Sequence, residues 1–311
     1  MLYFCGTGIE QLYRMESKAF IYVALLADLG IAVTKFIAAA FTGSSAMLSE
    51  GVHSVIDTVN QVLLLFGIKQ SKKKADQLRP FGYGREQYFW SFIVSLLMFS
   101  IGGCISFYEG ILRLKRPAAN ENQTWSYVVL AVAFVFTTIS LITTLKKFNT
   151  QRGELSFWHG IKESKDSSLF TVLLADIADI AGLVIAFLGV FLGHILQNRY
   201  YDAIASMVIG VFLVFISLLL VKESRSLLMG ETASRKTIRN IVALAESDPS
   251  IVKVKKHFSI YLSPEEIVLQ LIAVFQKDLT TAEITDAIRR ISRKIRKKFP
   301  RFKQIFIEPM S

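Results

Sequence analysis

Long apolar stretches, separated by short polar segments, fill most of the chain up to residue 221. Each stretch contains about 20 residues, which is the length that an α-helix needs to cross the apolar core of a bilayer. The stretches are too long and too continuous for the strands of a membrane barrel, which alternate in polarity over about 10 residues. The pattern therefore predicts six membrane-spanning helices, at residues 19–41, 46–67, 88–112, 125–145, 169–192 and 203–221.

After residue 221 the pattern changes to shorter elements of mixed polarity. Alternating apolar residues predict strands, and apolar residues at helical spacing with Lys and Arg on the other face predict helices. The expected elements are a helix at 238–247, strands at 252–262 and 267–275, a helix at 282–299 and a strand at 302–307. This order, α-β-β-α-β, predicts a small α+β domain. We therefore expect three regions: an N-terminal segment at 1–18, a six-span α-helical membrane domain at 19–221 and a C-terminal domain at 222–311.

The composition also indicates a membrane protein. Of the 311 residues, 52% are hydrophobic and 20% are charged, and the mean hydropathy is +0.43. A soluble domain usually carries more charge. The net charge is +11, and residues 222–311 contribute most of it, with 18 Lys and Arg against 10 Asp and Glu. Because apolar spans rarely accompany nucleic-acid binding, we expect no nucleic-acid partner and interpret the basic tail as a cytoplasmic domain near an anionic membrane surface.

The distribution of Lys and Arg among the loops predicts the orientation in the membrane. The loops after the second and fourth spans hold eleven such residues, whereas the other loops hold four. Both termini are therefore expected in the cytoplasm. The first eighteen residues lack the pattern of a cleaved signal peptide and of an organelle transit peptide. Together with the short chain, this favours the plasma (inner) membrane of a prokaryote as the location.

Ionisable side chains inside the predicted spans carry the strongest functional signal, because each costs about 2.5–3.5 kcal/mol at the centre of a membrane helix. His53 and Asp57 lie four residues apart in the second span and share a helix face, as Asp176 and Asp179 do in the fifth span. One cation between the two spans would gain one nitrogen and three oxygen ligands. This donor set suits zinc, cobalt, iron or manganese better than copper(I). The alternative is that these residues are buried polar groups that tie helices together.

Four segments resemble the cation diffusion facilitator (cation efflux) family. Residues 43–58 read Gly-Ser-Ser-Ala-Met-Leu-Ser-Glu-Gly-Val-His-Ser-Val-Ile-Asp-Thr, and residues 80–86 read Pro-Phe-Gly-Tyr-Gly-Arg-Glu. The segments at 202–206 and 223–231 are similar to the sixth span and the following linker of that family. The resemblance implies a homodimeric antiporter that exchanges Zn²⁺ or a similar ion for protons. It also implies a transport site between spans two and five, and a ferredoxin-like cytoplasmic tail that forms the dimer and often senses metal.

The fifth span departs from the family pattern, which usually contains His-x-x-x-Asp. With Asp176 at the position of the family aspartate, Val172 stands where the histidine is expected, and it cannot bind metal. The span resembles a divergent subgroup that includes the mitochondrial zinc exporter of animals. The resemblance implies three ligands, and Asp179 is the proposed fourth on spacing alone, so the predicted set is His53, Asp57, Asp176 and Asp179. Water, Asn60 and Asp28 are alternatives for the fourth place.

These features predict a proton-driven exporter of divalent metal cations, with Zn²⁺ as the first choice of substrate and no separate cofactor. Export of Mn²⁺, Fe²⁺ or Co²⁺, and a metal-sensing or scaffolding membrane protein that moves no ion, are open alternatives. An enzyme is not expected, because the sequence lacks the Gly-x-Ser-x-Gly and His-Glu-x-x-His motifs. His257 is the one histidine in the tail, which contains no cysteine. We therefore expect the homodimer to form by packing rather than through bound metal.

Overall fold

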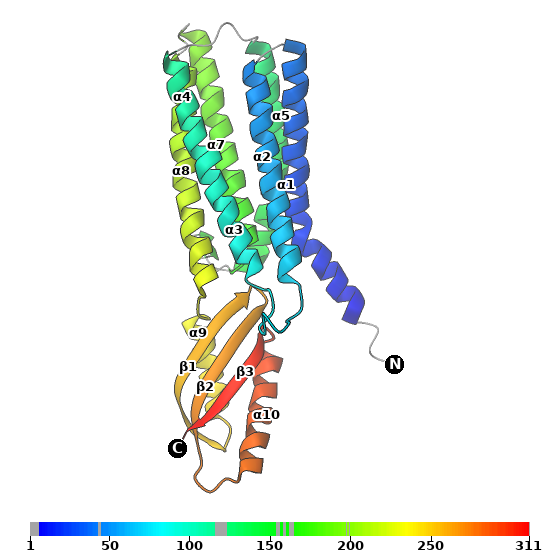
Figure 1. Cartoon of the computed structure of the whole chain (residues 1–311), viewed down its shortest axis with the longest axis vertical. Coiled ribbons are helices and arrows are strands. Elements are labelled where there is room, and N and C mark those ends of the chain that lie inside the picture. Colours follow the sequence, from blue (N-terminus) through cyan, green and yellow to red (C-terminus); the bar gives the residue numbers. More distant parts are fainter. Residues whose placement is uncertain are drawn as a thin grey trace. The chain divides into compact units, whose positions relative to one another are not determined.

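The computed structural model in Figure 1 describes residues 6–42, 45–115, 123–153, 156–157, 160–161, 165–196, 198 and 200–310. Within these ranges the side chains are described except at 6–19, 39, 41–42, 45–53, 123, 125–126 and 202. The chain forms two compact units. The first contains the chain up to Lys69 together with Phe89–Ser224, and the second contains Gln70–Tyr88 together with Arg225–Ser311.

The first unit consists of long helices. They include α1 (Gly6–Thr42), α2 (Ser45–Ser71), α5 (Gln123–Arg152), α7 (Ser167–Ile195) and α8 (Tyr200–Met229). Within the described residues, five helical segments are long and apolar enough to cross a membrane: Phe20–Ala38, Glu86–Lys115, Tyr127–Arg152, Ser167–Ile195 and Ala203–Met229. They coincide with the first, third, fourth, fifth and sixth predicted spans. The second predicted span falls on α2, where the side chains up to residue 53 lie outside the described part.

The third predicted span is interrupted. Helix α3 (Glu86–Leu97) continues into a π-helical segment, Met98–Ile105, and then into α4 (Ser106–Lys115). A π-helical segment is rare and widens the turn of the helix locally. The interruption could not be predicted from the sequence, because a run that is apolar on all sides has no periodicity to reveal it.

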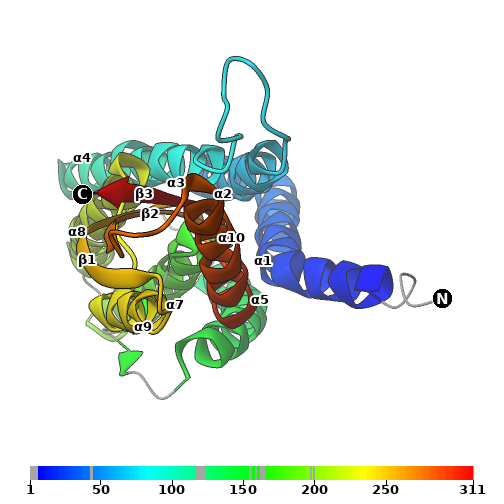
Figure 2. The ribbon, with the colours of Figure 1, turned by 90° about the horizontal axis from the view of Figure 1, so that it is seen from below.

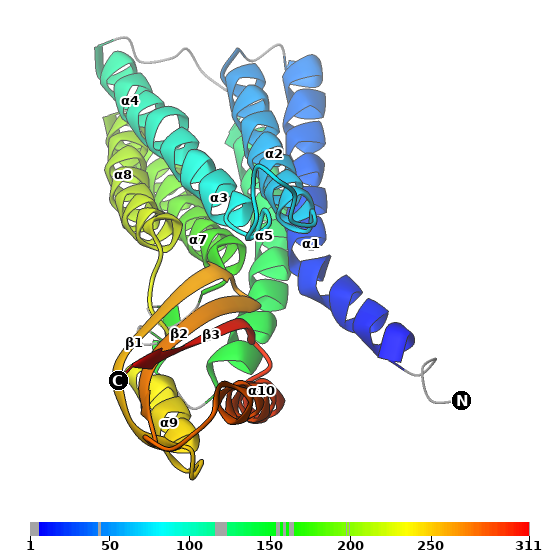
Figure 3. The ribbon, with the colours of Figure 1, turned by 60° about the horizontal axis from the view of Figure 1, so that its bottom comes forward.

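The helices of the first unit pack in a defined order. Helix α1 packs along α5, and α5 packs along α7, as Figures 1 and 3 show. Helix α8 approaches the π-helical segment and α4 through glycines. A Cβ atom on Gly110 would lie 2.5 Å from Cγ of Met207, and one on Gly210 would lie 2.6 Å from the backbone nitrogen of Phe107. Small residues at these crossings allow two helix backbones to approach closely, which is a common way for membrane helices to associate.

The second unit is built on a three-stranded sheet. Its strands are β1 (Ile251–Ser263), β2 (Glu266–Phe275) and β3 (Phe302–Met310). Strand β2 is central, antiparallel to β1 and parallel to β3. Helices α9 (Arg235–Glu246) and α10 (Thr281–Lys298) cover one face, as Figures 2 and 3 show. The element order is α-β-β-α-β, as the sequence predicts.

The core of this unit lies between the sheet and the two helices. Alternate residues of β2, Leu269, Leu271 and Ala273, are fully buried there, together with Ile241 of α9 and Ile291 of α10. Their period of two along the strand matches the pleat of a sheet that is buried on one face. Burying a Leu or Ile side chain contributes about 1.5–3 kcal/mol, so this alternation determines which face of the sheet receives the helices.

The loop between α2 and α3 belongs to the second unit and has its own structure. The carboxylate of Asp76 accepts hydrogen bonds from the hydroxyl of Tyr83 at 2.6 Å and from the backbone nitrogens of Arg79 at 2.7 Å and Leu78 at 3.0 Å. The Tyr83 hydroxyl, followed by these amides, lowers the pKa of Asp76. Arg79 also forms an ion pair with Glu86. The loop is therefore held by its own side chains.

The two glycines of this loop are required by geometry. Gly82 has a φ of +79°, in the left-handed region that residues with a side chain rarely adopt. A Cβ on Gly84 would lie 2.7 Å from the carbonyl oxygen of Leu262 on β1. The Gly-x-Gly signature thus provides one turn and one close backbone contact.

A buried ion pair makes the stability of the second unit sensitive to acid. The side chain of Asp248 is fully buried and accepts two hydrogen bonds from Arg290 of α10, at 2.7 and 2.8 Å. The guanidinium lowers the pKa of Asp248 to about 2. The lowered pKa means that the pair stabilises the fold above about pH 4 and loses this effect as the pH falls toward 2. Two pKa units correspond to about 2 kcal/mol when the partial exposure of Arg290 is taken into account.

We expect Asp248→Asn to speed cleavage of the tail in the full-length protein by about 25-fold at neutral pH. Limited trypsin digestion at neutral pH and pepsin digestion near pH 2 measure this effect. Near pH 2 the variant and the wild-type protein should be cleaved at nearly the same rate, because Asp248 is then about half protonated in the folded chain and almost fully protonated in the unfolded chain, so most of the stabilisation is lost. A difference between them that stays constant from neutral pH to pH 2 would contradict the role of the ion pair.

Candidate metal site

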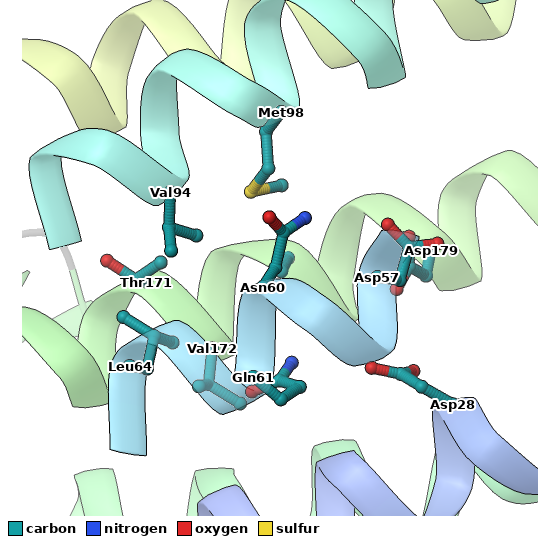
Figure 4. Close-up of a pocket in the computed structure, with 11 residues that line it drawn as sticks. Asp28, Asp57, Asn60, Gln61, Leu64, Val94, Met98, Thr171, Val172 and Asp179 are labelled. Carbon is teal, nitrogen blue, oxygen red and sulfur yellow. The ribbon is translucent and has the colours of Figure 1, made fainter. Parts of the chain in front are cut away.

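Two carboxylates from the second and fifth predicted spans meet inside the helical unit. Asp57 of α2 and Asp179 of α7 both line the same two small cavities. Figure 4 shows the first of these cavities, with the carboxylates of Asp57 and Asp179 lying together. Two carboxylates in an apolar bundle repel each other unless a cation or a proton lies between them, so this pair is suited to bind a cation.

Asp176, one turn before Asp179 on α7, is directed to another helix. Its carboxylate accepts hydrogen bonds from the hydroxyl of Ser140 at 2.9 and 3.0 Å and from the hydroxyl of Thr144 at 3.1 Å, both on α5. The residue is 4% exposed and lines neither of the two cavities. Of the two predicted ligands on α7, the structure therefore brings Asp179 to Asp57 and bonds Asp176 to α5.

The remaining predicted ligand, His53, lies outside the residues whose side chains are described. The backbone of α2 places it one turn before Asp57. Among the side chains that the structure describes, His, Cys, Asp and Glu residues form no group of three that could hold a metal ion. The set of four predicted ligands thus remains a prediction.

Val172 gives a structural reason for the altered donor set. It is fully buried and lines the first cavity, as Figure 4 shows. A histidine at this position would face the same space as Asp57 and Asp179. With valine in place of histidine, that wall lacks a nitrogen ligand, and the described donors around the cavity are oxygen atoms and the thioether of Met98.

Three polar residues join the carboxylate pair at the first cavity. Asp28 of α1 lines it and accepts a hydrogen bond from the side chain of Gln61. Asn60 and Gln61 of α2 also line it and are only 6% and 7% exposed. The sequence analysis named Asp28 and Asn60 as alternatives for the fourth ligand, but it missed Gln61. The available signal was an Asn-Gln pair inside an apolar span, one turn after Asp57.

The sequence of the chain matches a known family of membrane proteins. The family model for the cation efflux transmembrane domain matches residues 21–229. The chain belongs to the cation diffusion facilitator, or cation efflux, family. Members of this family are transporters rather than enzymes, and they carry metal ions as substrates without a cofactor. This cation efflux protein is accordingly a multi-pass membrane protein.

The names of its relatives refer to different metals. The protein is 32% identical over 219 residues to the mitochondrial proton-coupled zinc antiporter SLC30A9 of Homo sapiens, an alignment that covers 70% of this chain and 39% of the relative. It is 28% identical over 250 residues to metal tolerance protein C4 of Arabidopsis thaliana, covering 78% and 54%. It is 24% identical over 305 residues to the manganese efflux system protein MneP of Bacillus subtilis, covering 94% and 95%. The chain thus spans about two fifths of the length of its mitochondrial relatives.

Proposed function

We propose that this protein is a Zn²⁺/H⁺ antiporter that exports metal from the cytoplasm. The observation that carries the proposal is the meeting of Asp57 and Asp179, from two different helices, at cavities inside the bundle. The 32% identity to a proton-coupled zinc antiporter supports both the metal and the coupling ion. In this proposal the metal is the transported substrate and not a resident cofactor.

The proposed ligands are His53, Asp57, Asp176 and Asp179. His53 and Asp57 share a face of α2, and Asp176 and Asp179 are one turn apart on α7. The hydroxyls of Ser140 and Thr144 fit the role of groups that orient a ligating carboxylate through hydrogen bonds. Asp176 would then bind metal through lone pairs that these hydroxyls leave available.

Proton coupling follows from the chemistry of these ligands. Carboxylates and imidazole bind a metal ion only when they are deprotonated, so protons compete with the ion for the same atoms. When the site faces the more acidic side, protonation expels the metal. When it faces the cytoplasm, loss of the protons allows the metal to bind. The inward proton gradient then drives metal outward.

We further propose that the chain has six membrane spans, namely the five described above and α2, and that its tail has a ferredoxin-like fold. The functional regions would be residues 1–18, 19–221 and 222–311. Both termini would lie in the cytoplasm, and the plasma membrane of a prokaryote is the proposed location. The alignment over nearly the whole length of a Bacillus subtilis protein supports a prokaryotic setting.

A homodimer completes the proposal. The face of the tail's sheet opposite α9 and α10 exposes Phe258 of β1 and Phe306 of β3, which are 56% and 50% exposed and flank Gln270 of β2. Two aromatic side chains in one row of a sheet suit a contact between two copies of the chain. Light scattering of the protein in detergent tests this: a mass of one chain per particle would exclude the dimer, and a mass that drops only with chelator would show that metal holds it.

Mn²⁺ is the second candidate substrate. The manganese efflux protein aligns with more of this chain than the zinc antiporter does. Val172 also stands at the cavity where the family usually has a histidine, so the site lacks a nitrogen ligand that zinc accepts readily. Manganese, in contrast, prefers oxygen ligands. Both metals therefore belong in the first experiment.

The experiment measures metal flux into proteoliposomes with an acidic interior, using a dye that reports Zn²⁺ and Mn²⁺ inside the vesicles. We expect flux that collapses when an ionophore removes the proton gradient, and no flux into vesicles without protein. Flux that is indifferent to the gradient would exclude an antiporter. Metal binding without flux of Zn²⁺, Mn²⁺, Fe²⁺ or Co²⁺ would instead favour a sensor or scaffold.

A further inference from the structure

Asn60 occupies a distinctive place beside the carboxylate pair. It follows Asp57 by three residues on α2, so its side chain lies one turn further along nearly the same face. Of the residues that the structure describes, four line both cavities: Asp57, Asn60, Met98 and Asp179. Among the described residues, Asn60 is thus the one uncharged side chain with an oxygen ligand that lines both cavities.

The oxygen atom of this side chain has no hydrogen-bond donor among the residues that the structure describes. Asn60 is 6% exposed, and its Oδ1 accepts no hydrogen bond from any part of the chain that the structure describes. A buried acceptor without a partner costs about 1–3 kcal/mol, and such atoms are rare in folded proteins. Its neighbour in both cavities, Met98, has a thioether and cannot donate a hydrogen bond. The oxygen atom is therefore suited to a group that enters the cavity, and a cation drawn by the two carboxylates is such a group.

Neighbouring polar groups are arranged differently. Asp28 and Gln61 border only the first cavity, and Gln61 donates a hydrogen bond to Asp28. Figure 4 shows Asp28 and Gln61 on the side of the cavity toward α1, whereas Asn60 extends toward Met98. Asp176 borders neither cavity, because its carboxylate is bonded to Ser140 and Thr144. Among these alternatives, Asn60 is the residue placed to touch an ion that lies between Asp57 and Asp179.

We infer that Asn60 Oδ1 is a direct ligand of the transported cation, beside Asp57 and Asp179, and that it biases the site toward divalent ions that prefer oxygen, such as Mn²⁺. The inference rests on the proposed function and adds a ligand to it. Amide and carboxylate oxygens are the ligands of Mg²⁺, Ca²⁺ and Mn²⁺, whereas zinc gains affinity from nitrogen or sulfur. An amide also takes up no proton near neutral pH, so this ligand holds the ion without adding to proton competition.

The test compares Asn60→Leu, Asn60→Asp and Asn60→His in the proteoliposome assay with both metals. Asn60→Leu keeps the number and branching of the side-chain heavy atoms but removes the oxygen, and we expect the KM for Mn²⁺ to rise by about tenfold or more. Asn60→Asp restores an oxygen ligand and should return the KM for Mn²⁺ to the wild-type value or below it. Asn60→His exchanges oxygen for nitrogen, and it should shift the ratio of the Zn²⁺ and Mn²⁺ KM values toward zinc by about tenfold.

Thr138→Val is the matched control for the loss of a buried oxygen. The Oγ1 atom of Thr138 is also buried without a hydrogen-bond partner among the described residues, but Thr138 lines neither cavity. Its replacement by valine should leave both KM values unchanged. If Asn60→Leu and Thr138→Val behave alike, or if Asn60→His leaves the metal preference unchanged in a protein that still transports, Asn60 is not a ligand.

A binding measurement separates this inference from the transport proposal. Electron paramagnetic resonance measures the concentration of free Mn²⁺, and its decrease gives the amount bound to the full-length protein in detergent. If the wild-type protein binds Mn²⁺ but moves no metal, the transport proposal fails, and weaker binding in Asn60→Leu with recovery in Asn60→Asp still supports the ligand. If the wild-type protein transports metal and all Asn60 variants bind Mn²⁺ as it does, the ligand assignment fails and the transport proposal stands.

Discussion

Asp57→Asn is expected to reduce proton-driven metal flux by about 100-fold or more, because loss even of a group that supports a metal ligand costs about 10–100-fold. Asparagine has nearly the same shape as aspartate, so the helix packing around position 57 should persist. The change removes the negative charge that Asp57 contributes to both cavities. It leaves Asp179 as the only acidic residue that the structure places at both of them. Flux of Zn²⁺ and Mn²⁺ into proteoliposomes with an acidic interior measures the loss.

Replacement of the other carboxylates by asparagine should reduce metal flux to different degrees. Asp179→Asn should match Asp57→Asn, since both side chains border the same cavities. Asp176→Asn should reduce flux less, because an amide oxygen can still accept hydrogen bonds from Ser140 and Thr144 and the residue lies outside the cavities. Asp278→Asn, an exposed carboxylate in the second unit, is the control and should transport as the wild-type protein does.

The order within this series decides between two interpretations of the site. If Asp176→Asn abolishes flux while Asp179→Asn does not, the family position on α7 holds the metal and the pair at the cavities has another role. If Asp57→Asn transports at the wild-type rate, Asp57 does not bind the metal, and the proposed site built on Asp57 and Asp179 is wrong. Size-exclusion profiles of the variants in detergent exclude misfolding as the cause of a loss.

The sequence predicted the helices and strands better than the directions in which individual side chains point. Apolar runs located the spans, and alternation in β2 located the sheet, because burial acts on every residue of such an element. The spacing of Asp176 and Asp179 predicted one shared face. Yet three residues on a helix differ in direction by about 60°, and this difference sends one side chain to α5 and the other to the cavities. Which neighbour each one meets depends on packing between helices distant in sequence, and spacing alone does not contain that information.

The same limit applies to single residues whose partners are remote. The Gly-x-Gly segment was visible in the sequence, but its reason was not, since Gly84 makes room for a carbonyl that follows it by 178 positions, at Leu262. Gln61 was overlooked because one amide in an apolar span gives no periodic signal, although its side chain bonds Asp28 of another helix. Sequence patterns report the average environment of a face, whereas these roles depend on individual contacts.

The contact of α8 with α4 gives the largest expected effect on stability, from the replacement Gly210→Ala. A Cβ at this position would lie 2.6 Å from the backbone nitrogen and 2.8 Å from the Cα of Phe107. Backbone atoms cannot rotate away as the end of a side chain can, so the two helices must separate. Added volume at a closely packed contact costs about 1–3 kcal/mol, and we expect a value at the upper end, because a gap would also open along Gly103 and Gly110.

Gly102→Ala is the matched control for Gly210→Ala. Gly102 lies in the π-helical segment beside Gly103, but the nearest atom to its Cβ would be a side-chain carbon of Leu213 at 3.9 Å, an ordinary contact. Thermal unfolding of the two variants in the same detergent, followed by the loss of the monodisperse peak in size-exclusion chromatography, measures the difference. We expect Gly210→Ala to unfold several degrees below the wild-type protein and Gly102→Ala to unfold with it. Equal unfolding temperatures for all three would mean that the backbones of α8 and α4 are not in close contact at Gly210.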